Sequence, residues 1–519
     1  MSEGAVKKEE KPRKFQAIRG TRDLLPPETS LWNRVEQTAH EVFATFGFGE
    51  IRPPILEDTE LFARSIGAET DVVAKEMYTF GDRPAEMLTL SEIASSLGNY
   101  ARQLITFFAR AEIPQTVSNR YLVEALEITL KELDEAYKVV EASKKTGVGL
   151  QAAFGRCNDI LQEMGTMING IVLGLSLTMR PEATASVCRA YIERGMQQLP
   201  QPVKLYYMGP MFRRERPQKG RYRQFYQIGA EVLGGSDAPA IDAEVIEMVM
   251  TFFEKLELQG VQLEINSIGD RNCRPKYVEL LRAELHRVKD RLGPDSQRRI
   301  DTNPLRVLDS KVKEEQSIIE KLPRIGDHLC KECADHYAAV KRELDLSGVK
   351  YRENWRLVRG LDYYMRTTFE ITAQGLGSQD AVCGGGRYDG LVELLGGPPT
   401  KGIGFAIGED RLILSLQESG KAPVAQGRDV YIAWMGENAR ATAVRAAKTL
   451  RNAGFSVELP PVEQKFGKAL GQADKLGAKY ALILGDNEVT SGEWTLKTLA
   501  DGTQRKVSEQ QLIAELKKM

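Results

Sequence analysis

The stretch that decides the fold spans Tyr206–Gly234 and reads YYMGPMFRRERPQKGRYRQFYQIGAEVLG. The apolar, aromatic character of Leu205–Phe212 returns in Phe225–Val232, and both segments are predicted to be strands. Between them, Arg213–Arg223 holds five arginines, one lysine and a single acid. The stretch therefore predicts a long hairpin with a strongly basic loop.

A basic loop between two strands is suited to binding phosphate, because arginine forks pair bidentately with phosphate oxygens. A solvated basic hairpin would have the same composition. Three further segments favour a phosphate site: an Arg-Pro-Glu strand end at 180–182, a Gly-Gly-Gly-Arg-Tyr loop at 384–388 and a Gly-Ile-Gly…Arg segment at 402–411.

With 519 residues the chain is long enough for three or four domains. Its composition, 42% hydrophobic and 28% charged residues, is that of an ordinary globular protein. The net charge of −1 predicts that any RNA contact comes from local basic patches. Residues 1–14 are polar and lysine-rich and are predicted to be a disordered lead. Scattered cysteines and the lack of a long apolar run predict a cytoplasmic protein with no membrane insertion.

The pair Cys330 and Cys333 raises the question of zinc. A structural zinc site needs four ligands, and no second cysteine pair follows at suitable spacing. His328 and His336 could complete a set by proximity in sequence alone. The sequence therefore predicts no metal site.

The chain up to residue 350 is predicted to contain helices at 29–48, 187–196 and 240–256. Strands are expected at 50–56 and 261–269, and MYTF at 77–80 is expected to pair with a return strand in 175–185. Residues 271–350 are charged and mainly helical, with a strand-like LRVLD at 305–309. They are predicted to form a subdomain inserted in the core.

After this subdomain, strands are predicted at 355–361 and 367–372, followed by the glycine loop and a strand-helix unit from residue 402. Residues 425–427 are a predicted linker. Residues 428–519 alternate strand and helix, which predicts a small α/β domain with a parallel-rich sheet.

Residues 84–174 are predicted to form helices, at about 90–108, 119–145 and 150–171, from their apolar spacing. They contain no histidine and no acidic cluster at ligand spacing. A tolerated surface insertion, a docking module for protein or tRNA, and an artificial fusion are the three open interpretations.

Several quoted segments resemble the histidyl-tRNA synthetase family. FRRERPQKGRYRQFYQ resembles motif 2 of class II aminoacyl-tRNA synthetases. LVRGLDYYMRTTFE at 357–370 and GGGRYDGL at 384–391 are similar to the two histidine motifs of the family. IRGTRDLLP at 18–26 resembles its N-terminal signature, GFGEIRPPILEDTELF at 47–62 its motif 1, and GIGFAIGEDRL at 402–412 its motif 3.

The resemblance implies an α/β fold with an α+β catalytic core at 15–83 and 175–424, built on a class II antiparallel sheet with helices. The 84–174 insertion is atypical, since the family closes this hairpin tightly. Residues 271–350 would be the family's insertion domain over the tRNA acceptor stem. Residues 428–519 would be a C-terminal α/β anticodon-binding domain, and motif 1 would build a homodimer interface.

The resemblance also implies ligation of L-histidine to its tRNA through a histidyl-adenylate. Carried over by motif, Arg213 holds the α-phosphate, Arg359 reaches it from the other side, and Arg411 clamps the γ-phosphate. Glu215 and Phe225 contact adenine, and Mg²⁺ is expected with ATP. An internal ion pair of Arg359 with Asp362 or Glu370 is the alternative for that arginine, which is predicted to lie on a buried strand.

For the amino acid, the resemblance implies that Glu182 and Thr184 bind the ammonium group. Gln227 and Glu231 share one face of a strand, because positions i and i+4 lie on the same side, and Glu231 would accept an imidazole N–H. Tyr363, Tyr364 and Arg359 would complete the pocket. Tyr226 stands where many relatives carry histidine. For the tRNA acceptor end, the implied residues are Arg216, Gln218 and Arg223.

Two other functions share parts of this pattern. A catalytically silent relative that regulates histidine biosynthesis would bind histidine but typically lacks the anticodon domain and parts of the ATP motifs. A pure RNA- or partner-binding module is the third possibility. Arg213, Arg359, Arg411 and residues 428–519 favour the enzyme.

Overall fold

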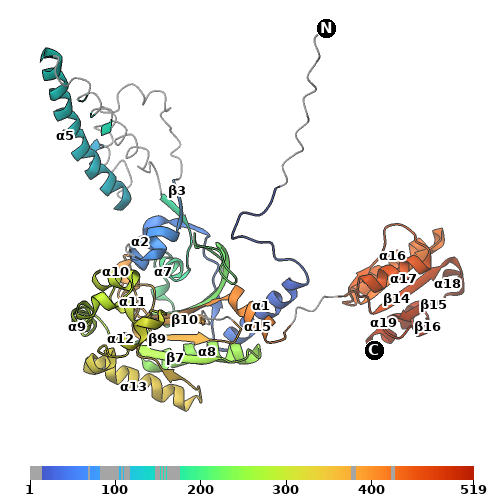
Figure 1. Cartoon of the computed structure of the whole chain (residues 1–519). Helices are drawn as coiled ribbons and strands as arrows, with labels where there is room; N and C mark the ends of the chain where they lie inside the picture. The colour runs from blue at the N-terminus through green and yellow to red at the C-terminus, as the bar shows by residue number, and fades with distance from the viewer. Residues whose placement is uncertain are drawn as a thin grey trace, which may run out of the picture. The chain divides into compact units, whose positions relative to one another are not determined.

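The structure is a computed structural model that describes residues 15–67, 70–81, 117–146, 176–375, 381–421 and 427–518, with isolated helical positions between 105 and 160. The chain divides into two compact units (Figure 1). The first holds residues 1–23 and 35–421, and the second holds residues 24–34 and 422–519.

The first unit is built on an eight-stranded sheet in the order β1-β5-β6-β11-β10-β9-β7-β8. Every neighbouring pair is antiparallel except β1 with β5 and β7 with β8. The predicted hairpin is confirmed as the pair β5–β6, with the basic loop between its strands. The strands are β1 (Gly49–Glu50), β5 (Val203–Phe212), β6 (Gln224–Leu233), β7 (Gln262–Ser267), β8 (Arg352–Glu353), β9 (Met365–Thr372), β10 (Ala381–Arg387) and β11 (Gly402–Gly408).

The first unit also contains a three-stranded antiparallel sheet in the order β2-β4-β3. Its strands are β2 (Leu56–Asp58), β4 (Ser176–Met179) and β3 (Tyr78–Gly81). The predicted pairing of MYTF with its return strand is confirmed by the register Tyr78 to Met179. The single strand predicted at 50–56 is wrong. Pro53 and Pro54, which lack backbone donors, separate β1 from β2.

The helices predicted at 29–48, 187–196 and 240–256 are present as α1, α7 and α8. Apolar residues of α8 are buried on one face, including Val245, Val249 and Phe252. The helices are α1 (Glu28–Thr45, from residue 35 in this unit), α2 (Thr59–Ile66), α5 (Val117–Thr146), α7 (Thr184–Glu193), α8 (Pro239–Lys255), α9 (Arg274–Arg287), α10 (Pro294–Thr302), α11 (Leu305–Leu308), α12 (Lys313–Ile319), α13 (Lys331–Leu346), α14 (Leu391–Leu394) and α15 (Glu409–Glu418).

Three local predictions are corrected. The strand-like LRVLD is the short helix α11, which follows Pro304 and buries Val307 and Leu308 in the core of the helical subdomain. The strand predicted at 355–361 is a loop, because the Asn266 side chain donates to the carbonyls of Trp355 and Leu357 in place of a strand ladder. Arg359 therefore lies in a loop and not on a strand.

The predicted glycine loop is instead part of strand β10. A Cβ on Gly385 would lie 2.4 Å from the Gly404 carbonyl oxygen and 2.6 Å from the Phe369 ring. Glycine is therefore needed here because neighbouring strands and side chains approach the backbone too closely for any side chain.

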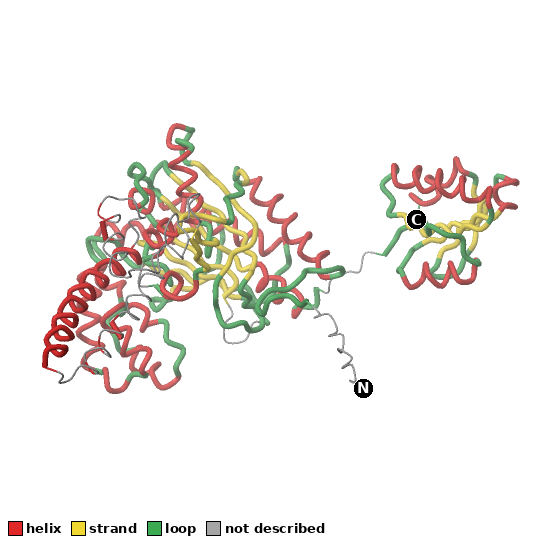
Figure 2. Tube along the Cα trace, turned by 90° about the horizontal axis from the view of Figure 1, so that it is seen from above, coloured by secondary structure: helices red, strands yellow, loops and turns green. Residues whose placement is uncertain are grey.

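The second unit has a mixed five-stranded sheet in the order β13-β12-β14-β15-β16, with helices on both faces (Figure 2). Alternate residues of β12 separate the two faces: Val430, Ile432 and Trp434 pack with α16, while Tyr431 and Ala433 pack with α17. The elements are β12 (Val430–Met435), α16 (Glu437–Asn452), β13 (Val457–Glu458), α17 (Phe466–Lys475), β14 (Tyr480–Gly485), α18 (Asp486–Ser491), β15 (Trp494–Thr498), β16 (Gln504–Val507) and α19 (Glu509–Lys517).

The predicted strand and helix alternation holds through β14, and β12 pairs in parallel with both β13 and β14. The last two strands are antiparallel, which the alternation did not predict.

In the 84–174 segment, the predicted helix at 119–145 is confirmed as α5, which buries Val123, Leu126 and Leu130. Within the other two predicted helices, the structure describes only residues 105–106, 152, 156 and 159–160, all of them helical, and the predicted disordered lead at 1–14 lies outside the described residues. Within the described part of the chain, no helix is both long and apolar enough to span a membrane.

Candidate active site

A cavity of about 520 Å³ opens over the middle strands of the large sheet. Its walls come from the β5–β6 hairpin, the loop before β9, strand β10 and the start of α15. The structure brings most of the predicted site residues into this one cavity: Glu182, Thr184, Arg213, Glu215, Phe225, Gln227, Arg359, Tyr363, Tyr364 and Arg411.

Arg213 leaves the end of β5, and its backbone N–H bonds to the Arg223 carbonyl across the hairpin. Its side chain is fixed by an Nε–H donated to the Pro181 carbonyl, at 2.9 Å. The guanidinium lies 5.3 Å from the Phe225 ring centroid and 3.8 Å from Glu215. Two of its sides are thus held, and the group reaches the cavity beside the predicted adenine-binding residues.

Arg359 enters from the loop before β9 and pairs with Glu370 at 2.9 Å. The alternative ion pair with Glu370 is therefore present, although Arg359 also lines the cavity. Its Nε is buried and has no hydrogen-bond partner within the described ranges. A Cβ on Gly384 would lie 2.1 Å from Arg359 Nη2, so the glycine of β10 leaves the room that the guanidinium occupies.

Arg411, in the first turn of α15, donates to the Ala381 carbonyl at 2.7 Å. The neighbouring Asp410 carboxylate accepts from the Tyr226 backbone at 2.9 Å and from Arg22 at 3.1 Å. The segment resembling motif 3 is thereby fastened both to the hairpin and to the N-terminal signature, and sequence reasoning did not predict this role for Asp410.

Glu182 sits just before α7, and its carboxylate accepts the backbone N–H groups of Thr184 and Ala185 at 2.7 and 2.9 Å. Burial raises the pKa of Glu182, while these two bonds and the charge of Arg213 lower it. The carboxylate is therefore oriented by the helix N-terminus and still faces the cavity.

Glu231 lies deeper than the cavity lining. Its two carboxylate oxygens accept from Thr184 Oγ1 at 2.7 Å and from the Tyr388 hydroxyl at 2.5 Å. Burial raises the pKa of Glu231 to about 8. The predicted imidazole acceptor thus stands directly behind Thr184, with Tyr388 as a partner that sequence reasoning missed although its motif was quoted.

Gln227 and the two tyrosines form the remaining wall. Gln227 Oε1 is buried with no hydrogen-bond partner in the part of the chain that the structure describes. The rings of Tyr363 and Tyr364 lie 4.7 Å apart, and Tyr363 meets Tyr388 edge-on at 5.7 Å. An unsatisfied amide oxygen in a wall that also holds two tyrosine rings suits a polar, flat ligand group.

The predicted tRNA residues do not line the cavity. Arg216 and Gln218 are exposed on the basic loop. Arg223 instead donates to the carbonyls of Arg19 and Glu215, at 3.3 and 3.4 Å, and so fastens the loop to the N-terminal segment.

Comparisons with known proteins agree with this geometry. A family model described as histidyl-tRNA synthetase matches residues 173–412, and one described as an anticodon binding domain matches residues 429–519. The histidine–tRNA ligase of Koribacter versatilis is 46% identical over 502 residues, which cover 96% of this chain and 95% of that protein. That of Solibacter usitatus is 45% identical, covering 97% and 99%. The chain belongs to the histidyl-tRNA synthetase family.

A crystal structure of apo histidyl-tRNA synthetase from S. aureus shares the fold, with a TM-score of 0.67 and 31% identity over 97% of this chain and all of that one. The resemblance drawn from the motifs and the predicted class II fold are both confirmed. One residue that lines the cavity, Arg306, lies outside every segment that resembles a family motif. It reaches the cavity from α11, and its Nε is buried without a hydrogen-bond partner among the described residues. No local pattern pointed to it, because its helix was predicted to be a strand.

Proposed function

We propose that this chain ligates L-histidine to its tRNA in two steps, through histidyl-adenylate, with release of AMP and diphosphate. The observation that carries the proposal is the meeting of three arginines, Arg213, Arg359 and Arg411, with the buried Glu182 and Thr184 in one cavity. Cationic groups for a nucleotide and a carboxylate for an ammonium group are what this pair of substrates requires.

In the first step, the histidine carboxylate attacks the α-phosphate of ATP, and diphosphate leaves. The attacking carboxylate is already a nucleophile, so the chain's task is positioning and charge stabilisation. Arg213 and Arg359 approach the α-phosphate from two sides, Arg411 holds the γ-phosphate end, and Phe225 with Glu215 holds the adenine. Glu182 and Thr184 hold the ammonium group.

Specificity for histidine is assigned to the inner wall. Gln227 offers an unsatisfied oxygen, Tyr363 and Tyr364 enclose the ring, and Glu231 accepts an imidazole N–H after Thr184 shifts. Mg²⁺ is expected with the triphosphate: the cavity walls supply carboxylates such as Glu370 and Glu76, its preferred oxygen ligands, and the ion would neutralise phosphate charge.

In the second step the terminal ribose of the tRNA takes the histidyl group. Arg216 and Gln218 of the basic loop are assigned to the acceptor end, where the extra 5′ guanosine of histidine tRNA would lie. Arg223, which was predicted to share this role, is assigned to holding the loop, because its guanidinium donates to the carbonyls of Arg19 and Glu215. Residues 428–519 are assigned to the anticodon and 271–350 to the acceptor stem. The 84–174 insertion keeps its three interpretations.

A homodimer and a cytoplasmic location complete the proposal. The segment resembling motif 1 exposes Ile55 and Leu56, which are 43% and 45% exposed in the single chain. Adjacent exposed apolar side chains at the predicted interface support self-association. Sedimentation velocity should report a dimer, and Leu56→Lys should shift it toward the monomer.

Histidine-dependent exchange between diphosphate and ATP tests the enzyme proposal. Exchange should require L-histidine among a panel of amino acids, and acylation of histidine tRNA should follow. The alternative, a silent regulatory subunit of histidine biosynthesis, would bind histidine without exchange. Absence of exchange in a folded preparation that binds histidine would decide for that alternative.

A further inference from the structure

Four potential metal ligands meet outside the cavity: Asp270, Cys273, Cys330 and Cys333. One oxygen and the three sulfurs all lie within 4.8 Å of one another. Asp270 and Cys273 belong to the turn between β7 and α9, whereas Cys330 is the N-cap of α13 and Cys333 lies in its first turn. The two pairs are 60 residues apart in sequence, measured from Asp270 to Cys330.

Hydrogen bonds within the turn hold the Asp270 carboxylate and the Cys273 sulfur close together. The backbone N–H of Asp270 donates to Cys273 Sγ at 3.4 Å, and that of Asn272 donates to Asp270 Oδ1 at 2.9 Å. Gly269 has a φ of +65°, and a Cβ there would lie 2.7 Å from Cys273 Sγ. Only glycine permits both this backbone and this approach.

We propose that these four residues bind a structural zinc ion. Thiolates with one carboxylate form a tetrahedral set that zinc accepts, and Zn–S bonds of about 2.3 Å place sulfurs roughly 3.8 Å apart, inside the observed spread. Four protein ligands leave no open coordination position, which is the mark of a structural site. Asp270, Cys273 and Cys333 are buried and Cys330 is partly exposed, so the ion has a path of entry.

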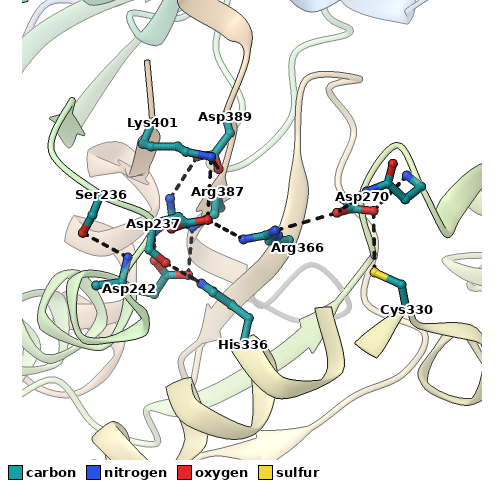
Figure 3. A network of polar contacts seen from close by, with 12 residues as sticks. Ser236, Asp237, Asp242, Asp270, Cys330, His336, Arg366, Arg387, Asp389 and Lys401 are labelled. Carbon is teal, nitrogen blue, oxygen red and sulfur yellow. Dashed lines mark hydrogen bonds and ion pairs between the residues drawn. The ribbon is translucent and has the colours of Figure 1, made fainter. Parts of the chain in front are cut away.

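The surroundings match the charge of such a site. Three thiolates and a carboxylate around a divalent ion leave excess negative charge. Arg366 Nη2 lies 3.8 Å from Asp270 Oδ2, and its Nη1 lies 2.9 Å from Asp237 (Figure 3). Arg274, which follows Cys273 in the sequence, supplies a second nearby cation. Zinc sites are ordinarily supported by such outer partners.

The two histidines that sequence spacing offered as ligands are engaged elsewhere. His336 Nε2 lies 3.1 Å from the Asp237 carbonyl, and His328 packs against the Tyr277 ring. The sequence-based expectation of no metal site rested on the lack of a second cysteine pair. The fold supplies the missing pair as an aspartate and a cysteine from a distant turn.

The proposed ion would join the N-terminus of α9 to the N-terminus of α13. Arg366, at the start of β9, donates its backbone N–H to the Gly269 carbonyl at 2.7 Å. Arg274 donates to the Tyr364 carbonyl at 2.5 Å, and Tyr364 lines the cavity. The site would therefore hold the base of the subdomain and the loop behind the tyrosine wall.

Elemental analysis of the full chain, purified without chelator and without a metal-affinity tag, tests the proposal. We expect about one zinc ion per chain, retained through dialysis. Cys330→Ser and Cys330→Ser/Cys333→Ser should lose it, whereas Cys188→Ser, a buried cysteine outside the cluster, should keep it. Zinc retained in the double variant would mean an adventitious ion elsewhere and would overturn the proposal.

Two measurements on the unmutated chain remain decisive if a variant fails to fold. Titration with p-mercuribenzoate should release zinc in step with thiol modification. Cobalt substituted for zinc should show thiolate-to-metal charge-transfer bands with the intense visible bands of tetrahedral cobalt. Metal-free protein that develops neither feature with added zinc or cobalt would rule out the site.

Discussion

Two guanidinium groups at the large sheet, those of Arg387 and Arg359, differ in how completely the chain satisfies them. Arg387 in β10 is 1% exposed; it bonds to Asp242 through two nitrogens and to Asp389 at 2.9 Å (Figure 3). Arg359 is 21% exposed and pairs with Glu370, while its Nε has no hydrogen-bond partner among the described residues. A saturated guanidinium stabilises the fold, whereas an incompletely satisfied one at a cavity wall is available to a ligand.

The largest expected effect is on stability, from Arg387→Ala. It removes the guanidinium that compensates the buried Asp242 carboxylate and leaves His336, 3.8 Å away, as a weaker partner. The free energy of unfolding should fall by about 3–5 kcal/mol. Urea denaturation followed by circular dichroism measures the change. Lys401→Ala, which removes an exposed partner of Asp389, is the control and should cost less than about 1 kcal/mol. Equal losses in the two variants would remove the distinction between saturated and available arginines.

Arg359→Ala should do the opposite: keep the fold and lose the chemistry. Removing one preorganised charge at a developing phosphate oxyanion costs roughly 10²–10³ in rate, so histidine-dependent ATP–diphosphate exchange should fall by that factor. The unfolding midpoint should stay close to wild type, and so should both quantities in Arg352→Ala, an exposed arginine on β8. Exchange within about tenfold of wild type would leave Arg359 as a structural partner of Glu370.

The sequence predicted only part of the site that surrounds these arginines. Aromatic and apolar runs predicted the β5–β6 hairpin, and the two-residue period placed Gln227 and Glu231 on one face. Local composition failed at 355–361, whose apolar residues resemble a strand, because the deciding hydrogen bonds come from Asn266 on β7. Such contacts, like those that bring Arg306 to the cavity, join segments whose pairing no local pattern specifies.

Glu231 extends the comparison between groups satisfied within the chain and groups available to a ligand. Its carboxylate is already bonded to Thr184 and Tyr388, yet it is also assigned to bind the imidazole of histidine. With a pKa of about 8, Glu231 is mostly protonated at pH 7 and must ionise to accept an imidazole N–H as a carboxylate. Histidine affinity should therefore rise up to about tenfold per pH unit from pH 6.5 toward pH 8. Isothermal titration calorimetry across this range should show the slope in wild type and its loss in Glu231→Gln, with weaker binding at pH 8.

The stability of the free protein provides an independent check on Glu231. Its folded pKa of about 8 exceeds the ordinary value of 4.5, so the folded state binds more protons than the unfolded state between these values. This group therefore makes unfolding easier as pH rises through that window, and Glu231→Gln should flatten the trend. If the histidine affinity of the wild type does not change with pH while the stability still falls with rising pH, Glu231 does not contact the ligand. Its role would then be only to hold Thr184 in place.

The smallest expected effect separates two arginines of the basic loop, Arg216 and Arg223. Arg216 is exposed and is assigned to tRNA phosphate, whereas Arg223 donates to the carbonyls of Arg19 and Glu215. Losing one phosphate contact lowers the slope of log affinity against log salt by roughly 0.7–0.9. Filter binding of histidine tRNA at several salt concentrations should show this change in Arg216→Ala, with exchange activity unchanged.

Arg223→Ala should keep the wild-type slope and lower exchange, because the loop that carries Glu215 loses its attachment to the N-terminal segment. An unchanged slope in Arg216→Ala together with a reduced slope in Arg223→Ala would reverse the two assignments and show that a guanidinium bonded to its own backbone can still serve the RNA.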